Sequence, residues 1–257
     1  MLRKLICILK LGLNQDKIGE HAPTATHTTL TVIVKDKPMT ELVLAVNRQE
    51  LDIQGVGTNG IYPIDLSELN QQNYAYLPRT FADNKSENAI ALGVQFPQIL
   101  GYFQIMYQGN ILTYQRKGKE KGLLGKWSIG VGGHVSQEDF IEYTADCMEN
   151  YPSLASLVYT GAVRELQEEL GISTRWIDLG YEESFCEAVT QVIATFADPT
   201  STVHVGLPLT VELPDHLFEA LNLDPAEFNN IKWLSPHELK TSGLEFETWS
   251  QLLVDQM

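Results

Sequence analysis

The chain has 257 residues and a formal net charge of −15, and 44% of its residues are hydrophobic. A chain of this length can bury a substantial core in one large domain or in two smaller ones. The acidic excess argues against a nucleic-acid duplex as a partner, because duplex binding requires clustered lysine and arginine side chains. An anionic substrate would therefore need a metal ion or a local basic patch.

The cysteine pattern and the lack of long apolar runs predict a cytoplasmic protein. Cys7, Cys147 and Cys186 are widely spaced and form no metal-binding motif. Three thiols cannot all pair within one chain, so a reducing compartment is expected. No apolar run approaches the ~20 residues that cross a bilayer, so no membrane partner is expected. Lys10 interrupts the apolar stretch Leu5–Leu13, which argues against a signal peptide.

The N-terminal part contains two candidate strands, Leu30–Val34 and Leu42–Val46, which are rich in branched apolar residues. Residues 36–38 predict a turn between them. The glycine-bearing segment 54–60 lacks the Gly-Lys-Ser/Thr of a P-loop, so it predicts an ordinary loop. Residues 64–98 show no clear periodicity.

The patterns become clearer after residue 98. Phe103–Tyr107 and Ile111–Tyr114 flank three turn-forming residues and predict a hairpin. Trp127–Val131 predicts another short strand. Further strands are expected at 192–196, 203–211 and 231–234, helices at 153–170 and 246–254, and a loop or short helix at 224–230. This irregular alternation predicts an α+β fold, in which helices pack on a mixed sheet.

The segment RELQEELGI, residues 164–172, has a pattern of acids with a geometric meaning. Taking Glu165 as zero on a helical wheel, Glu168 lies near ~300° and Glu169 near ~40°. The three carboxylates therefore share one helix face. An apolar stripe lies beside them and can enter the core; it consists of Tyr159, Val163, Leu166 and Leu170. Gly171 stands where a left-handed C-cap is expected.

Three like charges on one face repel one another unless a cation neutralises them. Magnesium prefers carboxylate oxygens, keeps several waters and often also binds substrate phosphates. Arg164 precedes the first acid and is placed to hold Glu165 in a fixed orientation. A surface helix rich in glutamate is the plain alternative, but a chance match to the whole pattern is on the order of 10⁻⁵ at average residue usage.

RELQEELGI resembles the second half of the Nudix signature, Arg-Glu-apolar-x-Glu-Glu-x-Gly-apolar. The resemblance implies an α/β/α sandwich and a diphosphate hydrolase that uses Mg²⁺, or Mn²⁺ in its place. It implies metal binding by Glu165, Glu168 and Glu169, with the Gly132 carbonyl as an additional ligand, and catalytic roles for Arg164 and Glu165. The stretch GKWSIGVGGHVSQED, residues 125–139, together with LPR at 77–79, resembles the Nudix branch labelled predicted phosphoesterases, which also has an extended N-terminal region.

This sequence departs from the family pattern between the two halves of the signature. Gly133 precedes Arg164 by 31 positions, where the family has 14, so about 17 residues are inserted, roughly from Phe140 to Pro152 and a few residues beyond. Counted forward from Gly133, the position of the family's first glutamate holds Asp139, a shorter acid. Counted back from Arg164, it holds Ser156.

A basic, glycine-containing loop provides candidates for binding substrate phosphates: Arg116, Lys117, Lys119, Lys121 and Lys126. We favour Arg116 and Lys126, and we add His134 because it follows the glycine pair. Glu227 lies in a late loop where some Nudix enzymes place a general base, although a surface glutamate is the simpler interpretation. His204, Trp127 and Trp233 are expected in strands or the core.

We therefore expect an N-terminal extension, residues 1–98, packed on a Nudix domain, residues 99–257. The expected reaction is Mg²⁺-dependent hydrolysis of a phosphoanhydride in a nucleotide or nucleoside diphosphate derivative, and the expected partner is a phosphorylated small molecule. A homodimer is left open. Two alternatives remain: a nucleotide-sensing module that has lost catalysis, and an enzyme similar to isopentenyl diphosphate isomerase. The loop at Gly132–His134 lacks the cysteine that such an isomerase uses.

Overall fold

The computed structural model describes residues 41–51, 59–66, 69, 73–79, 93–117, 122–140, 153–171, 188–196 and 202–257. The predicted strand Leu30–Val34, the turn at 36–38 and most of the predicted insertion lie outside these residues. The three cysteines lie outside them as well. No helix among the described residues is long and apolar enough to cross a membrane.

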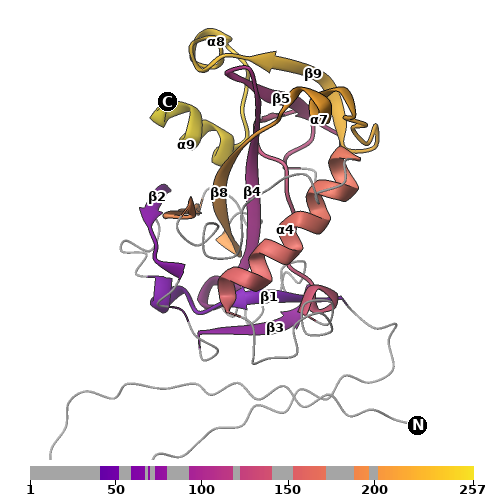
Figure 1. The fold of residues 1–257 in the computed structure, drawn as a ribbon. Coiled ribbons are helices and arrows are strands. Elements are labelled where there is room, and N and C mark those ends of the chain that lie inside the picture. Colours follow the sequence, from indigo (N-terminus) through magenta and orange to yellow (C-terminus); the bar gives the residue numbers. More distant parts are fainter. Residues whose placement is uncertain are drawn as a thin grey trace, which may run out of the picture. The chain divides into compact units, whose positions relative to one another are not determined.

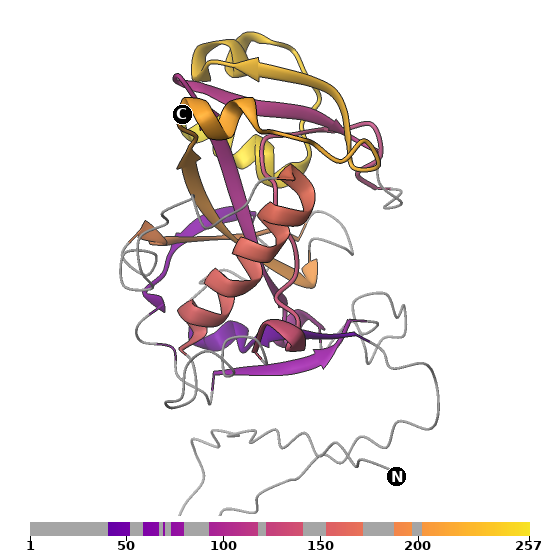
Figure 2. The ribbon, with the colours of Figure 1, turned by 45° about the vertical axis from the view of Figure 1, so that its right-hand side comes forward.

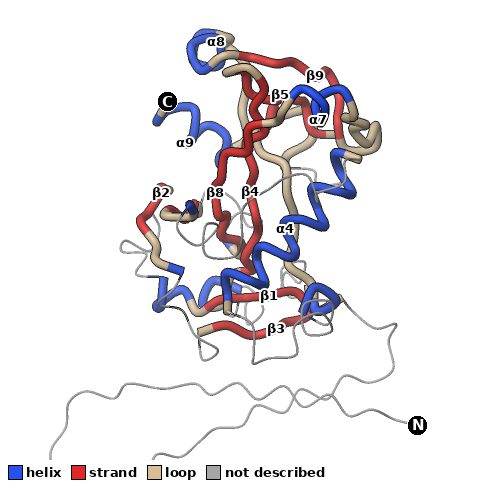
Figure 3. Tube along the Cα trace, viewed as in Figure 1, coloured by secondary structure: helices blue, strands red, loops and turns tan. Residues whose placement is uncertain are grey.

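One mixed sheet organises the described part of the chain (Figures 1 and 3). Its strands are β1 (Leu42–Val46), β2 (Gly60–Pro63), β3 (Tyr74–Pro78), β4 (Gln98–Tyr107), β5 (Asn110–Arg116), β6 (Trp127–Ser128), β7 (Gln191–Ala194), β8 (His204–Glu212) and β9 (Phe228–Leu234). The helices are α4 (Leu154–Leu170), α7 (Asp215–Glu219), α8 (Pro236–Thr241) and α9 (Thr248–Gln256), with a 3-10 turn at Arg48–Leu51. The strand order is β2-β7-β8-β4-β1-β3, and outside this order β5 pairs with β4, β6 and β9.

Strand β4 is the centre of this arrangement. It runs parallel to β8 from Gln98, opposite His204, to Met106, opposite Glu212. At its far end it turns back into β5 through a tight hairpin, where Tyr107 pairs with Asn110. The predicted hairpin is therefore confirmed, and β4 begins five residues earlier than its apolar pattern indicated.

The two faces of β4 pack against different helices, because successive side chains of a strand point in opposite directions. Phe103 and Ile105 belong to the core cluster that includes the apolar face of α4. Tyr102 belongs to a second cluster with Trp249 and Leu253 of α9. Figure 2 shows the sheet running between these helices. This arrangement confirms the expected α+β sandwich.

Helix α4 begins and ends where the sequence predicts. The Ser153 side chain accepts a hydrogen bond from the Ser156 N–H, which satisfies one of the unpaired donors of the first turn. Gly171 ends the helix in the left-handed conformation with φ 66°, and its N–H donates to the Gln167 carbonyl. These caps, together with the apolar stripe, fix which face of α4 is turned away from the core.

Other elements differ from their predictions because tertiary pairing decides them. Strand β6 covers only two residues, and Val131 contacts β4 through an isolated bridge to Phe103. Residues 228–230 were predicted as loop or short helix but begin β9, where Phe228 pairs with Arg116 of β5. The domain boundary at residue 98 stays a prediction, and Ala45 of β1 pairs with Gln98 in the same sheet.

Candidate active site

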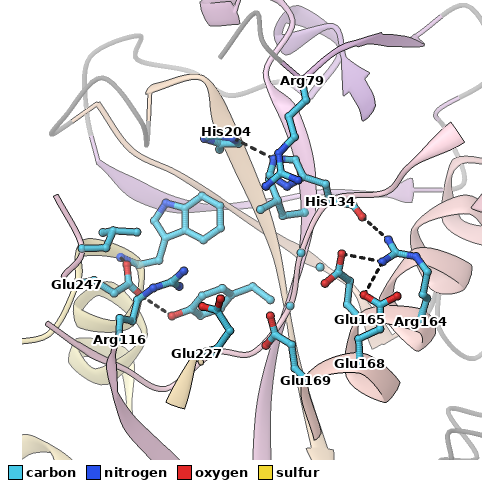
Figure 4. A pocket seen from close by; sticks show the side chains of 18 of the residues that line it. Arg79, Arg116, His134, Arg164, Glu165, Glu168, Glu169, His204, Glu227 and Glu247 are labelled. Carbon is cyan, nitrogen blue, oxygen red and sulfur yellow. Dashed lines mark hydrogen bonds and ion pairs between the residues drawn. The ribbon is translucent and has the colours of Figure 1, made fainter. Parts of the chain in front are cut away.

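A cavity of about 560 Å³ opens beside the acidic face of α4 (Figure 4). Its wall combines residues from the sheet, from the glycine loop after β6 and from the start of α9. Its lining residues include Glu41, Arg79, Tyr102, Arg116, Leu124, Gly132, Gly133, His134, Arg164, Glu165, Glu168, Glu169, His204, Glu227, Glu247 and Trp249. The cavity therefore unites segments from residue 41 to residue 249.

All three acids predicted from the helical wheel line this cavity. Glu168 is the most open, with 60% of its side chain exposed, whereas the side chain of Glu165 is 17% exposed. Glu169 is half-buried. One face of α4 thus presents a graded set of carboxylates, from solvent to the cavity interior.

Arg164 fixes two of these carboxylates from the same helix. Its Nη1 donates to Glu165 at 3.0 Å and to Glu168 at 3.2 Å. Its Nη2 donates to the His134 carbonyl at 2.9 Å, which ties α4 to the glycine loop. On its other side the guanidinium binds Asp139, whose side chain is fully buried. The expected orienting role of Arg164 toward Glu165 therefore has a geometric basis.

The glycine loop approaches α4 so closely that a side chain would not fit. A β-carbon at Gly133 would overlap the carboxyl group of Glu165. At Gly132, where φ is 151°, it would overlap the Gly101 carbonyl oxygen. The backbone of the loop therefore forms the wall against which the Glu165 carboxylate rests.

Burial and mutual repulsion raise the pKa values of two of the acids. The pKa of Glu169 rises to about 8, first through burial and then through the charge of Glu165. Arg116 and a hydrogen bond from the Gly132 N–H oppose this rise. The pKa of Glu165 also rises through burial, although Arg164 counteracts it. A positive charge in the cavity would relieve both shifts.

The donor set fits a hard divalent cation. Among the described residues, no three acidic, imidazole or thiol groups converge closely enough to form a complete metal cage. Carboxylates on an open wall nevertheless suit magnesium, which keeps several waters and takes further oxygens from a substrate. Burial first, and then the charge of Glu165, raises the pKa of Glu169, and a bound cation would oppose both effects.

A second group of polar side chains lines the cavity away from these acids. His134 and His204 are linked through their Nε2 atoms at 3.3 Å. The His204 Nε2 also lies 3.2 Å from the Gln98 Oε1, and the Gln98 Nε2 donates to the Arg79 carbonyl at 3.3 Å. The pKa of His134 is well below its usual range, first because of burial and then because of His204 and two nearby arginines. His134 is therefore neutral near pH 7.

The remaining wall is more apolar and rests on a buried polar network. The Tyr102 hydroxyl donates to the Glu247 carboxylate, which also accepts from the N–H groups of Trp249 and Ser250 at the start of α9. The Tyr102 ring packs edge-on against Trp249, with 5.4 Å between the ring centroids. Leu124, 60% exposed, stands at the rim of the cavity.

Most of the site residues expected from the sequence come together here, with two exceptions among the described residues. Arg116, His134 and Glu227 all line the cavity beside the three acids and Gly132. Lys126 is not among the lining residues, and its Nζ lies 3.8 Å from Glu245. Lys117 does not line the cavity either, and its Nζ donates to the Pro225 carbonyl at 2.9 Å. The other two candidates of the basic loop, Lys119 and Lys121, lie outside the described part of the chain.

Several lining residues had no functional role predicted from the sequence, among them Glu41, Glu247 and Trp249, and Arg79 was noted only as part of the LPR stretch. They are single residues at the ends of strands or at a helix start. His204 was expected in a strand or the core; it begins β8, is 9% exposed and also contributes to the cavity wall. Only the strand order brings these positions to one cavity.

The fold is that of the Nudix hydrolases. The chain is similar to Tm1382, “a putative Nudix hydrolase”, with a TM-score of 0.56 and 18% identity over 84% of this chain and 97% of that one. Weaker matches include the NUDIX domain of Shewanella oneidensis NrtR complexed with ADP ribose (TM-score 0.40, 14% identity, 68% and 94% of the two chains) and a MutT NUDIX hydrolase from Burkholderia pseudomallei (TM-score 0.36, 14% identity, 63% and 98%). No family model and no curated protein matches the sequence.

The structural likeness confirms the Nudix-type fold expected from RELQEELGI. The assignment to the predicted phosphoesterase branch and the insertion of about 17 residues stay predictions. At 18% identity the likeness carries no information about substrate.

Proposed function

We propose that this protein hydrolyses a phosphoanhydride bond in a nucleotide or nucleoside diphosphate derivative with the help of Mg²⁺ or Mn²⁺. One observation carries the proposal: Glu165, Glu168 and Glu169 line a single cavity together with Arg116. The acids form the carboxylate wall that a divalent cation requires, and the arginine suits a phosphate.

In this proposal Glu165, Glu168 and Glu169 hold the cation, with the Gly132 carbonyl as an additional ligand. The cation, when bound, neutralises charge on the phosphoryl oxygens and lowers the pKa of water. Arg164 holds the Glu165 and Glu168 carboxylates in place through its Nη1. Arg116 binds a phosphate of the substrate, as its position on the cavity wall allows.

Glu227 is our candidate for the group that accepts a proton from the attacking water. It lines the cavity, and its charge raises the pKa of Glu169, which places the two carboxylates within electrostatic reach. Its backbone is held to β5, because its carbonyl accepts from the Lys117 N–H at 3.3 Å. The loop before β9 is also held to the end of α4, because the Asp224 N–H donates to the Glu169 carbonyl at 3.2 Å.

The test is incubation of the full chain with Mg²⁺ and a panel of nucleotide sugars, dinucleotides, nucleoside triphosphates and isopentenyl diphosphate, followed by chromatographic and mass analysis of the products. Our proposal predicts a nucleoside monophosphate from at least one diphosphate. Tight nucleotide binding without product would indicate a sensor instead. Conversion of isopentenyl diphosphate into its isomer would indicate the isomerase alternative. We also propose a cytoplasmic location, as the cysteine pattern suggests.

A further inference from the structure

The cavity has two distinct ends on either side of the acidic wall. We name the first the Arg79 end, formed by Arg79, His134 and His204. The other is the Arg116 end, named for Arg116. Figure 4 shows Arg79, His134 and His204 grouped together, well apart from Arg116. A substrate that spans the acidic wall would therefore meet donor groups at both ends.

We propose that the Arg79 end binds a second anionic group of the substrate, a phosphate monoester separate from the diphosphate that is cleaved. The inference rests on the proposed function, which it extends to a class of substrate. Arginine presents several N–H donors in a plane that matches phosphate oxygens. The ion pair with Glu41 engages one of these nitrogens, Nη1, at 2.8 Å.

The Arg79 end is held by a chain of hydrogen bonds with a defined direction. The Gln98 amide nitrogen donates to the Arg79 carbonyl, so the Gln98 oxygen faces His204. A carbonyl oxygen only accepts, and His204 must therefore carry a proton on Nε2. That nitrogen has a single proton, which it shares between the Gln98 oxygen and the His134 Nε2, so the His134 Nε2 accepts and its own proton lies on Nδ1.

These hydrogen bonds link the Arg79 end to the glycine loop that contains Gly132 and Gly133. His134 follows Gly133, and its carbonyl accepts from Arg164. An anion bound at Arg79 would therefore lie next to the loop that supports Glu165. The backbone of Arg79 is fixed by its N–H, which donates to the Glu41 carbonyl at 2.8 Å. The guanidinium is thus attached to a rigid strand end.

Glu41 provides a control, because its substitution should change the affinity for anions in the opposite direction to substitution of Arg79. Its carboxylate lines the cavity beside Arg79 and would repel a phosphate. Removing the negative charge with Glu41→Gln should strengthen anion binding, whereas Arg79→Gln should weaken it. Both side chains are more than 40% exposed, so neither substitution removes core packing.

The experiment compares ligand pairs that differ by one phosphate monoester. In metal-free buffer with EDTA, calorimetry measures the affinities of AMP and adenosine 3′,5′-bisphosphate. With Mg²⁺, kcat/KM is measured for NADH against NADPH and for dephospho-coenzyme A against coenzyme A. We expect the native protein to prefer the additional phosphate in the binding pair and in at least one substrate pair.

Arg79→Gln should reduce this preference about tenfold, the value expected for loss of one charge-assisted hydrogen bond. Arg79→Lys should retain most of it, and Glu41→Gln should increase it. Lys240→Gln, which removes a positive charge from exposed α8 outside the cavity, should change nothing. The proposal is overturned if Arg79→Gln weakens both members of each pair equally, or if the native protein shows no preference.

The metal-free binding measurement and the kinetic measurement with Mg²⁺ test this inference and the proposed function separately. Absence of turnover with every substrate, together with an Arg79-dependent preference for the bisphosphate, would refute the hydrolase and support the anion site. Turnover of diphosphates without any such preference would support the hydrolase and refute the anion site.

Discussion

Asp139 and Arg164 form a two-point ion pair behind the acidic wall. Arg164 donates to the two Asp139 carboxylate oxygens from Nε at 2.7 Å and from Nη2 at 3.2 Å. Asp139 also accepts from the Ser136 N–H at 2.6 Å and has no exposed surface. The shorter acid therefore fixes the arginine that holds Glu165 and Glu168, and it does not line the cavity itself.

Asp139→Asn should destabilise the protein. The substitution leaves the guanidinium of Arg164 without its buried counter-charge, and breaking such a pair costs about 3 kcal/mol. Urea denaturation followed by tryptophan fluorescence measures the change. Glu219→Gln, at an exposed acid of α7, serves as a control for the same kind of substitution and should cost much less. Equal stabilities of the native protein and Asp139→Asn would contradict the role of this pair.

Gly133→Ala should impair activity while leaving stability nearly unchanged. The new methyl group would overlap the Glu165 carboxyl, which is the mobile end of a side chain and can move aside. Because the carboxylate then leaves its position, we expect kcat to fall on the order of 10- to 100-fold, as for loss of a group that orients a metal ligand. Steady-state kinetics and thermal unfolding provide the two readouts.

Gly122→Ala is the matched control, because a β-carbon there meets no atom of the described residues within 4 Å. It should retain native kinetics. If Gly133→Ala were as active as Gly122→Ala, the close approach of the loop to Glu165 would have no functional importance.

Glu227→Gln should reduce kcat without weakening the metal site. A general base contributes about 10²- to 10⁴-fold to the rate, so we expect a decrease in that range. The Mn²⁺ affinity, measured by electron paramagnetic resonance, should remain native. A large loss of Mn²⁺ affinity would instead assign Glu227 to the metal site, and an unchanged kcat would exclude it as the base.

The local sequence was sufficient to predict α4, its caps and the shared face of its three acids. These features depend on spacing within one helix, where residues three and four positions apart become neighbours. The hairpin between β4 and β5 was also predictable from local sequence, because turn-forming residues separate its two apolar strands. Neither prediction required knowledge of distant contacts.

The rest of the site depends on pairing between strands that are far apart in the sequence. Arg79 reaches the cavity because β3 pairs with β1, and His204 because β8 runs beside β4. The beginning of β9 was predicted as a loop or short helix because Phe228 becomes a strand residue only beside Arg116. Nothing in the local sequence distinguishes Glu247 from other acidic residues, because its hydrogen bond with Tyr102 depends on the tertiary structure.

The central claim is that the acidic face of α4 binds the cation required for hydrolysis. The most direct test measures Mg²⁺-dependent product formation by Glu168→Gln and Glu169→Gln, with Glu219→Gln of α7 as a control outside the cavity. We expect both cavity variants to lose at least about 100-fold in kcat, the rate equivalent of several kcal/mol of charge stabilisation, while circular dichroism remains native. Native turnover in both variants would contradict the claim.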